Sequence, residues 1–498
     1  MLAWTIYISF LGAAVLMLLP AGHPRPARWT ALLAALAGLA CAAAGVADCR
    51  HHAGFGAFTD AVNAPWIAEL GIRFHLAADG ISLVLVLLTG LAAVAGVLFS
   101  WNVENRTREF FAFYLALIGG VYGVFLSVDL FLLFVFYEMA IIPKYFLIAV
   151  WGSTRREYGA MKLAIYSFVG SAMVLVGLMA AYVMAGGRTF DLVELARHAN
   201  SFPPAFQNWA FIVVFVGFAI LAGLWPFHTW APTGHVAAPT AASMLLAGVV
   251  MKLGAYGALR VAMTLFPVGL HTWQNTIAVL AVVGIVYGAL VALVQQDFKY
   301  VIGYSSVSHM GFVLLGLMTL TQIGLSGAVL QMFSHGIIAG LLFAVVGRMV
   351  YDRTHTRDLG KLQAMNLSQV LPFAAMTFVV GGAASMGLPG FSGFIAELQV
   401  LVGAWQSFPA LAILAAVGIL AGIAYTLRAM VKAFYAEGAV EARDLPRLQP
   451  ITVPERAGAL LLLGATLLVG LWPQLLLGMI TPALNSPLMQ PLWKAGPP

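Results

Sequence analysis

The chain has 498 residues, of which 62% are hydrophobic and only 9% are charged. Soluble domains contain about 25% charged residues, so this composition excludes an ordinary water-soluble protein and predicts one surrounded by lipid. The net charge of +6 does not indicate nucleic-acid binding, because the Lys and Arg residues lie in short loops between apolar runs. The two cysteines, Cys41 and Cys49, show no metal-ligand or redox spacing.

Apolar runs follow one another along nearly the whole chain. A helix that crosses the hydrocarbon layer needs about 20 such residues, so we expect an all-α polytopic membrane protein with about fourteen transmembrane helices. The first run lacks a basic leader, and we expect the first two runs to be retained helices rather than a cleaved signal peptide. One run, 370–405, is too long for a single simple span. The expected spans are 2–20, 29–47, 79–100, 110–127, 129–150, 159–186, 208–226, 239–264, 275–296, 300–320, 324–350, 370–405, 409–435 and 456–479.

The basic residues predict how these spans are oriented. Loops that follow even-numbered spans hold few of them, mainly Arg50, Arg73, Arg188 and Arg197. Positively charged loops stay inside, so we expect the odd-numbered loops in the cytoplasm and both termini on the non-cytoplasmic side of the inner (plasma) membrane. The loops after odd-numbered spans contain Arg25, Arg28, Arg106, Arg108, Arg155, Arg156, Lys299, Arg353, Arg357, Lys361, Arg443, Arg447 and Arg456.

Two spans contain helix-breaking sequences. The first break is Trp-Pro-Phe-His at 225–228, and the second is Gly-Leu-Pro-Gly at 387–390. Proline removes a helical hydrogen bond, and irregular backbone at membrane depth survives only inside protein or beside a wet cavity. Two such breaks in separate halves predict a transporter built from repeats. The alternative is that both breaks are ordinary helix ends beside short loops.

Three charged residues lie deep inside apolar spans: Glu138, Lys252 and Glu397. A charge near the middle of a membrane costs about 2.5–3.5 kcal/mol on insertion scales, so such residues are functional candidates. A buried carboxylate pairs with a cation or becomes neutral, and a neighbouring charge can switch it between these states. We therefore predict that these three residues form part of a proton relay.

Further polar residues within the spans have two interpretations each. Histidine titrates near neutral pH and hydroxyl groups can hold water chains, so His309 and His335, with Ser305, Ser306, Ser308 and Ser334 nearby, are relay candidates or packed hydrogen bonders. The same holds for His228 and His235 at the first break. For the two remaining candidates the alternatives are snorkelling toward the cytoplasmic end for Lys144 and a surface anchor for Lys299. We find no nucleophile–base pair, phosphate loop, metal cluster or Rossmann motif, and expect transport without bond-making chemistry.

These segments resemble the M-subunit family of bacterial respiratory NADH:quinone oxidoreductase (complex I), equivalent to mitochondrial chain 4. A glutamate at 397, in place of lysine, favours the M type over the related L and N types. The matching segments extend over most of residues 100–440. They are Tyr137–Met139, Tyr145–Ile148, Pro226–Trp230, His235, Ala238–Ala241, Lys252, Asp297–Lys299, Tyr304–Phe312, His355–Asp358, Leu388–Gly390 and Phe394–Glu397.

The resemblance implies fourteen spans with two inverted five-helix repeats, roughly 110–264 and 275–435. The chain then divides into N-terminal helices (1–105), a first antiporter-like repeat (106–270), a second repeat (271–440) and a C-terminal helix with a tail (441–498). It also implies roles: Glu138 matches the modulating glutamate of the fifth span, and Lys252 the lysine of the eighth. His309 and His335 match the connecting histidines, and Glu397 the glutamate toward the exit.

The resemblance further implies that this chain carries proton transport within a quinone-reducing enzyme. No cofactor is expected in the chain itself; NADH, FMN, iron–sulfur clusters and quinone would belong to partner subunits. The expected partners are the L-, N- and K-type antiporter-like subunits, other small membrane subunits and the lipid bilayer, with no nucleic acid. Alternatives are a multisubunit cation/proton antiporter without redox chemistry, a membrane-bound hydrogenase or carbon-uptake complex, and a structural membrane scaffold.

One position departs from the family pattern. The family commonly has a lysine in the seventh span, seven residues before the histidine of the first break, where this chain has Leu221. That lysine is the usual ion-pair partner of the fifth-span glutamate, so its absence puts the standard charge switch at Glu138 in doubt. Either Lys144 or His228 supplies the charge from another place, or the first half-channel works differently. We favour substitution by Lys144.

Overall fold

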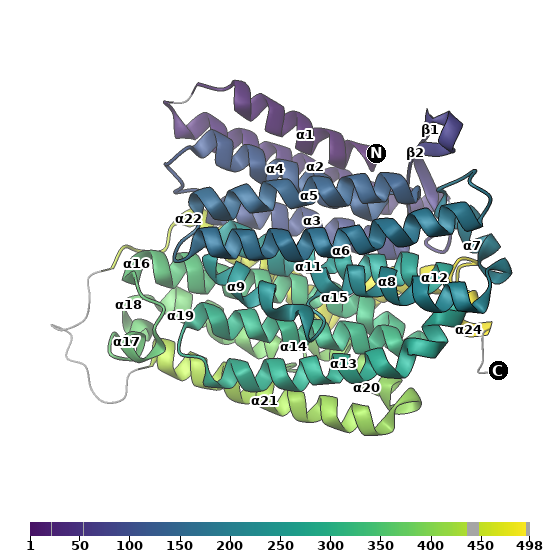
Figure 1. Cartoon of the computed structure of the whole chain (residues 1–498). Helices are drawn as coiled ribbons and strands as arrows, with labels where there is room; N and C mark the ends of the chain where they lie inside the picture. The colour runs from purple at the N-terminus through teal and green to yellow at the C-terminus, as the bar shows by residue number, and fades with distance from the viewer. Residues whose placement is uncertain (21, 53, 436–447, 495–498) are drawn as a thin grey trace.

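The computed structural model describes residues 1–20, 22–52, 54–435 and 448–494, and the predicted basic residues Arg443 and Arg447 lie outside these ranges. Its long helices run side by side in one bundle (Figure 1). The first half comprises α1 (Ala3–Leu18), α2 (Pro24–His52), α3 (Gly80–Phe99), α4 (Thr107–Leu126), α5 (Leu130–Trp151), α6 (Arg156–Met184), α7 (Leu192–His198), α8 (Pro204–Ala222), α9 (Trp230–Ala237), α10 (Thr240–Leu245), α11 (Met251–Gly257) and α12 (Met263–Leu265). The second half comprises α13 (Pro267–Val294), α14 (Phe298–Met318), α15 (Gln322–Ala344), α16 (Asp352–Thr354), α17 (Leu359–Gln363), α18 (Leu367–Val370), α19 (Pro372–Ser385), α20 (Ser392–Ser407), α21 (Pro409–Phe434), α22 (Val453–Leu471), α23 (Gln474–Leu484) and α24 (Pro491–Lys494).

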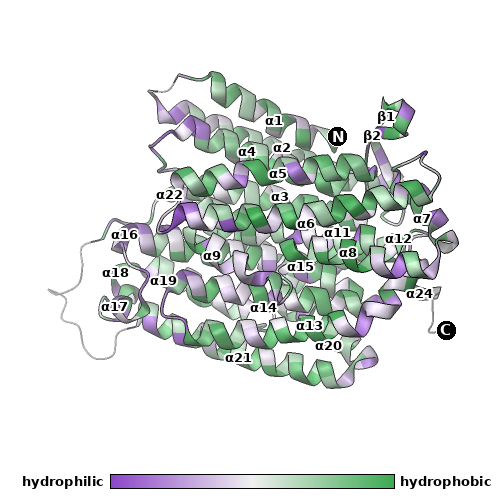
Figure 2. Ribbon diagram, viewed as in Figure 1, coloured by the Kyte–Doolittle hydropathy of each residue, from purple (hydrophilic) through white to green (hydrophobic). Residues whose placement is uncertain are grey.

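The bundle is built to lie in a membrane. Within the described ranges, twelve helices are long and apolar enough to span it, and three shorter apolar helices are α1, α19 and α23. Large apolar side chains such as Val183 and Leu420, each 66% exposed, cover the outside, whereas hydrophilic residues gather at the two ends (Figure 2). The predicted polytopic helical membrane fold is confirmed, and the total of fourteen spans stays a prediction.

Both predicted breaks interrupt helices. At the first break α8 ends at Ala222, and its C-cap Gly223 has a φ of 86°, in the left-handed region that favours glycine. A single 3-10 turn, Phe227–Thr229, then leads into α9. The next span contains two π-helical segments, Leu246–Val250 and Ala258–Ala262, on either side of α11. The overlong run 370–405 is two helices, α19 and α20, separated at the second break.

An antiparallel hairpin lies outside the helices and was not predicted from the sequence. It consists of β1 (Thr59–Ile67) and β2 (Ile72–Ala78), paired from Thr59 opposite Ala78 to Ile67 opposite Ile72. In Figure 1 the hairpin, α7 and α24 lie at one end of the bundle, and α16, α17 and α18 lie at the other. The N-terminus, marked in Figure 1, lies at the same end of the bundle as the hairpin.

Two isolated backbone bridges at opposite ends of the bundle each join a pair of aspartates. Asp129 pairs with Asp191 in one, and Asp297 with Asp358 in the other. Each of the four aspartates also accepts backbone N–H groups at the start of a helix, as a helix cap does. The bridges occupy matching places in the two predicted repeats, which themselves remain a prediction.

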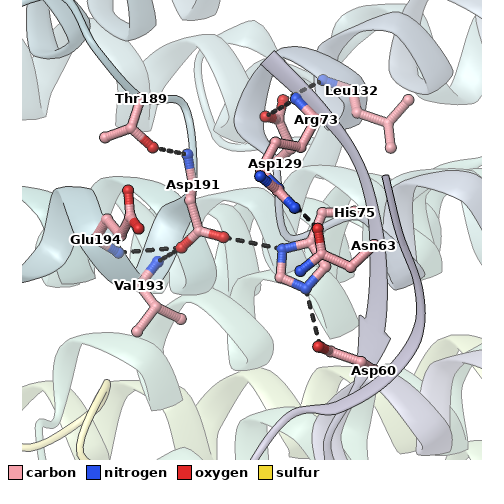
Figure 3. Close-up of polar contacts among 10 residues, drawn as sticks. All are labelled: Asp60, Asn63, Arg73, His75, Asp129, Leu132, Thr189, Asp191, Val193 and Glu194. Carbon is pink, nitrogen blue, oxygen red and sulfur yellow. Dashed lines mark hydrogen bonds and ion pairs between the residues drawn. The ribbon is translucent and has the colours of Figure 1, made fainter. Parts of the chain in front are cut away.

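His75 of β2 ties the hairpin to the connection between α6 and α7 (Figure 3). Its Nδ1 lies 2.9 Å from Oδ2 of Asp191, and its Nε2 lies 2.9 Å from Oδ1 of Asp60. Burial lowers the pKa of His75, but the hydrogen bonds and charges of Asp191 and Asp60 outweigh burial, so the pKa is raised overall. When protonated, the ring donates to both carboxylates and joins segments that are far apart in sequence.

This geometry predicts a pH-dependent hairpin. A raised folded-state pKa stabilises the hairpin fully below the unfolded pKa of about 6.5, and this stabilisation is lost as pH rises through the folded pKa. Amide hydrogen exchange at residues 72–78, corrected for intrinsic exchange rates, should therefore accelerate severalfold from mildly acidic to alkaline pH. The H75Q variant should remove this dependence, and an unchanged pH profile in H75Q would contradict the role given to His75.

Candidate functional site

In the core of the bundle, two predicted relay residues from the two halves of the chain are in direct contact. Nζ of Lys252, on α11, lies 2.7 Å from Nδ1 of His335, on α15. Lys252 is 0% exposed and His335 4% exposed. Lys252 also donates a hydrogen bond to the carbonyl of Ala247, inside the π-helical segment before α11. Since π-helical turns commonly occur at functional sites, this local geometry supports a working role for Lys252.

Two glycines allow the helices of Lys252 and His335 to approach. A Cβ added to Gly336 would lie 2.6 Å from the carbonyl oxygen of Gly248 and 2.7 Å from a methyl group of Leu88. A Cβ on Gly248 would lie 3.1 Å from the carbonyl oxygen of Gly336. The absence of side chains at this crossing therefore sets the distance between the lysine and histidine side chains.

A second pair continues the row. Nδ1 of His309, on α14, lies 2.9 Å from Oε1 of Glu397, on α20, and Nε2 of His309 lies 3.2 Å from the hydroxyl of Ser385. Gln331 donates a hydrogen bond of 3.2 Å to the same glutamate oxygen. The rings of His309 and His335 are stacked with centroids 5.5 Å apart, so the two pairs are neighbours.

A small cavity adjoins both histidines. It measures about 10 Å³, and its lining includes His309, His335, Ser305, Ser334 and Glu397. A cavity of about 10–15 Å³ holds one water molecule. Nε2 of His335 is buried without a hydrogen-bond partner among the described residues, so the space beside it is both polar and large enough for one bridging water.

Lys299 lies near the end of the bundle that carries the basic loops. Its Nζ donates a 2.7 Å hydrogen bond to the carbonyl of Ala238, at the end of α9. Lys299 lines a cavity of about 230 Å³ together with Asp352, and its side chain is 3% exposed. His235 lies within electrostatic range of both Lys299 and Lys252. The structure thus buries the side chain of Lys299, which is therefore not an exposed surface anchor.

The other end of the row lies beside the second break. Oε2 of Glu397 lies 3.0 Å from the position that a Cβ would take on Gly387, whose φ is 71°. The break itself is at the surface of the chain, since Leu388 is 51% exposed. Direct contacts thus join Lys252 to His335 and His309 to Glu397, and the two histidine rings stack. His235 and Lys299 extend this set toward the basic end through electrostatic range only, and we call the six residues the row.

Glu138 and Lys144 lie apart from this row. Glu138 is only partly buried in α5, next to the exposed side chains of Met139 and Ile142. Lys144 is 1% exposed, so it does not snorkel to the surface of the chain. The charge of Lys144 acts on Glu138, but the described part of the chain contains no direct ion pair between them. Leu221, at the family's lysine position, is 2% exposed in α8.

His228 is likewise separate from the row. It lies in the 3-10 turn of the first break, 2% exposed, with its ring 5.2 Å from that of Tyr287. Within the described ranges neither ring nitrogen has a hydrogen-bond partner. Ser306 and Ser308 were candidates for holding water, but both donate to backbone carbonyls, of Ile302 and Ile285.

Sequence reasoning missed several polar residues of the core. Gln331 lies four residues before His335 on α15 and therefore on the same helix face, which is the signal that could have revealed it. Ser385 lies just before the second break. Arg260 lies inside the expected span 239–264, and the criterion that selected Lys252 selects it too. Asp79 stands at the first residue of the expected span 79–100 and gave no such signal.

The described residues contain no group of three or more His, Cys, Asp or Glu side chains arranged to hold a metal ion. What the row contains instead is a series of amine, imidazole and carboxylate groups, each able to bind and release a proton. Fold and site together define a polytopic helical membrane protein with a row of protonatable side chains through its core.

The comparisons identify the family. The model of the NADH:quinone oxidoreductase/Mrp antiporter transmembrane family matches residues 127–423, more than half of the chain, and the chain belongs to this family. It is 38% identical to NADH-quinone oxidoreductase subunit M of Rhodobacter capsulatus, over 84% of this chain and 82% of that protein. It is 40% identical to an NAD(P)H-quinone oxidoreductase chain 4 of Synechococcus sp., over 82% and 78% of the two chains.

Solved structures give the same result for the fold. A chain of respiratory complex I from Thermus thermophilus matches with a TM-score of 0.88 and 29% identity, over 99% of this chain and 100% of that one. A chain of the Mrp complex from Dietzia sp. matches with a TM-score of 0.86 and 24% identity, over 98% and 97%; this likeness concerns the fold alone. The resemblance found in the sequence is confirmed.

The glycine crossing yields a prediction. In G336A the new methyl group would clash with the Gly248 carbonyl and push α15 away from the lysine, with an overpacking cost of about 1–3 kcal/mol. Proton pumping per NADH oxidised should fall severalfold, as measured with a pH-sensitive dye in vesicles. G340A is the matched control, because the nearest atom to its new methyl group would be 4.0 Å away. Equal pumping in the two variants would contradict the proposed importance of this crossing.

Proposed function

We propose that the chain is the proton-translocating M-type subunit of a respiratory NADH:quinone oxidoreductase. The observation that carries the proposal is the buried row in which Lys252 meets His335 and His309 meets Glu397. The relatives that match most of the chain are subunits of such quinone oxidoreductases, which supports this assignment.

The contact between Lys252 and His335 limits how many protons the pair carries. Two positive charges 2.7 Å apart repel by about 6 kcal/mol at an effective dielectric constant of about 20. Since 1.4 kcal/mol corresponds to tenfold in an equilibrium, the doubly protonated pair is rare. The pair therefore holds one excess proton at a time, and a change in the local field decides which nitrogen carries it.

The proposed route follows the row. Protons enter from the cytoplasm at the cavity of Lys299 and pass His235 to load on Lys252. From Lys252 they cross to His335, His309 and Glu397, with one water molecule in the small cavity completing the step between the histidines. Release toward the outside takes place beside the second break. A change of charge at Glu138 shifts the proton affinity of the row and couples it to its neighbours.

The redox chemistry belongs to other subunits in this proposal. NADH, FMN, the iron–sulfur clusters and quinone bind there, and this chain receives their energy through its membrane contacts. L-, N- and K-type antiporter-like subunits and small membrane subunits are the proposed partners. The proposed location is the inner (plasma) membrane, with both termini on the non-cytoplasmic side, opposite the basic loops.

A multisubunit cation/proton antiporter without redox chemistry is the second candidate, because the chain shares its fold with an Mrp complex. Isolating the assembly that contains this chain discriminates between the two. Co-purified flavin, iron–sulfur clusters and NADH:quinone activity support the first proposal, whereas an assembly without redox centres supports the second.

Removing the central amine should stop proton movement. In K252M, proton pumping by the complex in vesicles should fall below one tenth of the wild-type rate, since the amine that receives the proton is absent. The matched control is K361A, which removes an exposed lysine of α17 and should leave pumping unchanged. Normal pumping in K252M would refute the route.

The substitution proposed for the missing seventh-span lysine is tested at Lys144. In K144M the charge that acts on Glu138 is lost, and we expect pumping to fall by half or more while the complex still assembles. Restoring a lysine elsewhere, in the double variant K144M/L221K, should recover part of the activity. Unchanged pumping in K144M would show that Lys144 does not replace the family's lysine.

A further inference from the structure

A buried ion pair outside the proton row joins two helices near the hairpin end. Arg260, in the π-helical segment Ala258–Ala262, contacts Oδ1 of Asp79, and their side chains are 1% and 2% exposed. Asp79 also accepts a 3.0 Å hydrogen bond from the backbone N–H of Ser82 and so caps α3. The pair therefore connects the start of α3 to the span that carries Lys252.

Arg260 shares a helix face with the central lysine. Lys252, Tyr256 and Arg260 follow at intervals of four residues, which places them one above another along the span. The hydroxyl of Tyr256 lies 3.0 Å from the hydroxyl of Ser82 and donates a 3.2 Å hydrogen bond to the carbonyl of Phe125. Polar side chains thus extend from Lys252 toward the hairpin end, away from His335.

We call Lys252, Tyr256 and Arg260 the column; it is a possible leak path for protons. Hydroxyl groups conduct protons when water joins them. Polar side chains therefore extend from Lys252 in two directions, sideways to His335 and along the span to Tyr256. The sideways direction is the proposed working route. Efficient pumping requires that some feature of the column prevents protons from leaking along the span past Tyr256.

Arg260 has the properties required for this task. Its guanidinium stays protonated in proteins and therefore cannot pass a proton on. Its Nε and Nη1 are buried and have no hydrogen-bond partner among the described residues, and the group lies 5.7 Å from the ring centre of Tyr256. A fixed positive charge in a narrow polar path excludes protons and other cations.

We propose that Arg260, held in place by Asp79, is a charge lock that closes the hairpin end of the Lys252 span to protons. Asp79 positions the guanidinium, and Arg260 supplies the barrier. The lock forces a proton on Lys252 to leave through His335. This inference rests on the proposed function, because it assigns Lys252 as the proton carrier.

The test measures passive proton leak in the whole purified complex, reconstituted in liposomes with an imposed pH gradient and no NADH. The main variant is D79N/R260Q, which replaces both charges by amides and avoids leaving one buried charge unpaired. D79N alone keeps the arginine charge, and R260K keeps a positive charge with a different shape. NADH oxidation in each variant reports assembly.

The charge lock predicts that D79N/R260Q dissipates the gradient at least threefold faster than wild type and that R260K stays near the wild-type rate. D79N keeps the arginine charge but loses the carboxylate that positions it, so it should leak less than the double variant. A merely structural ion pair predicts that D79N and the double variant leak alike, or that neither leaks, and either result overturns the proposal. If D79N/R260Q does not assemble, the apolar pair D79L/R260M serves the same comparison.

A triple variant separates this proposal from the function on which it rests. K252M/D79N/R260Q should leak at the wild-type rate, because the leak is expected to pass through Lys252. A leak that persists in the triple variant refutes the charge lock but leaves pumping through Lys252 untouched. Normal NADH-driven pumping in K252M alone refutes the proposed function instead.

Discussion

The contact between Lys252 and His335 is the interaction on which the rest of the site depends. It brings two proton-binding nitrogens within 2.7 Å in the core, where burial of both side chains limits how far solvent shields one charge from the other. Repulsion limits the pair to a single excess proton, so its state is sensitive to any nearby change of charge. The close approach of the helices at Gly248 and Gly336 sets this distance. Helix packing therefore determines how strongly the charges of Lys252 and His335 interact.

Four buried cationic side chains among the described residues are held in two different ways. Lys252 and Lys299 bond to backbone carbonyls, of Ala247 and Ala238, at places where the helix is π-helical or ends. By contrast, Arg260 and Arg353 contact the carboxylates of Asp79 and Glu455. A carbonyl stabilises the ammonium group without fixing its charge as a carboxylate does, because its partial charge is smaller. At a broken helix, unpaired backbone carbonyls therefore stabilise a buried lysine ammonium group while still allowing it to lose its proton.

The helical membrane fold could be predicted from the sequence, and the residues of the row could be singled out as candidates, because a polar or charged residue inside an apolar run is conspicuous. It could not show that Lys252 touches His335, since 83 residues separate them and the crossing depends on two glycines without a motif of their own. The hairpin was missed because its first strand, Thr59–Ile67, shows no clear alternation and contains Pro65, and the alternation at 72–76 is short. Lys299 was ambiguous because its position at a span's start fits a surface anchor as well as a buried amine.

Glu138 presents the remaining physical problem. It lies outside the row, partly exposed on a face of α5 that also carries the exposed side chains of Met139 and Ile142. Leu221 offers no charge where the family has a lysine, so within this chain Lys144 is the group whose field reaches the carboxylate. An apolar face with a half-buried carboxylate is costly against lipid but not against another protein. In the complex proposed above, a neighbouring subunit would cover this face of α5, and Lys144 would remain the charge of this chain that acts on Glu138.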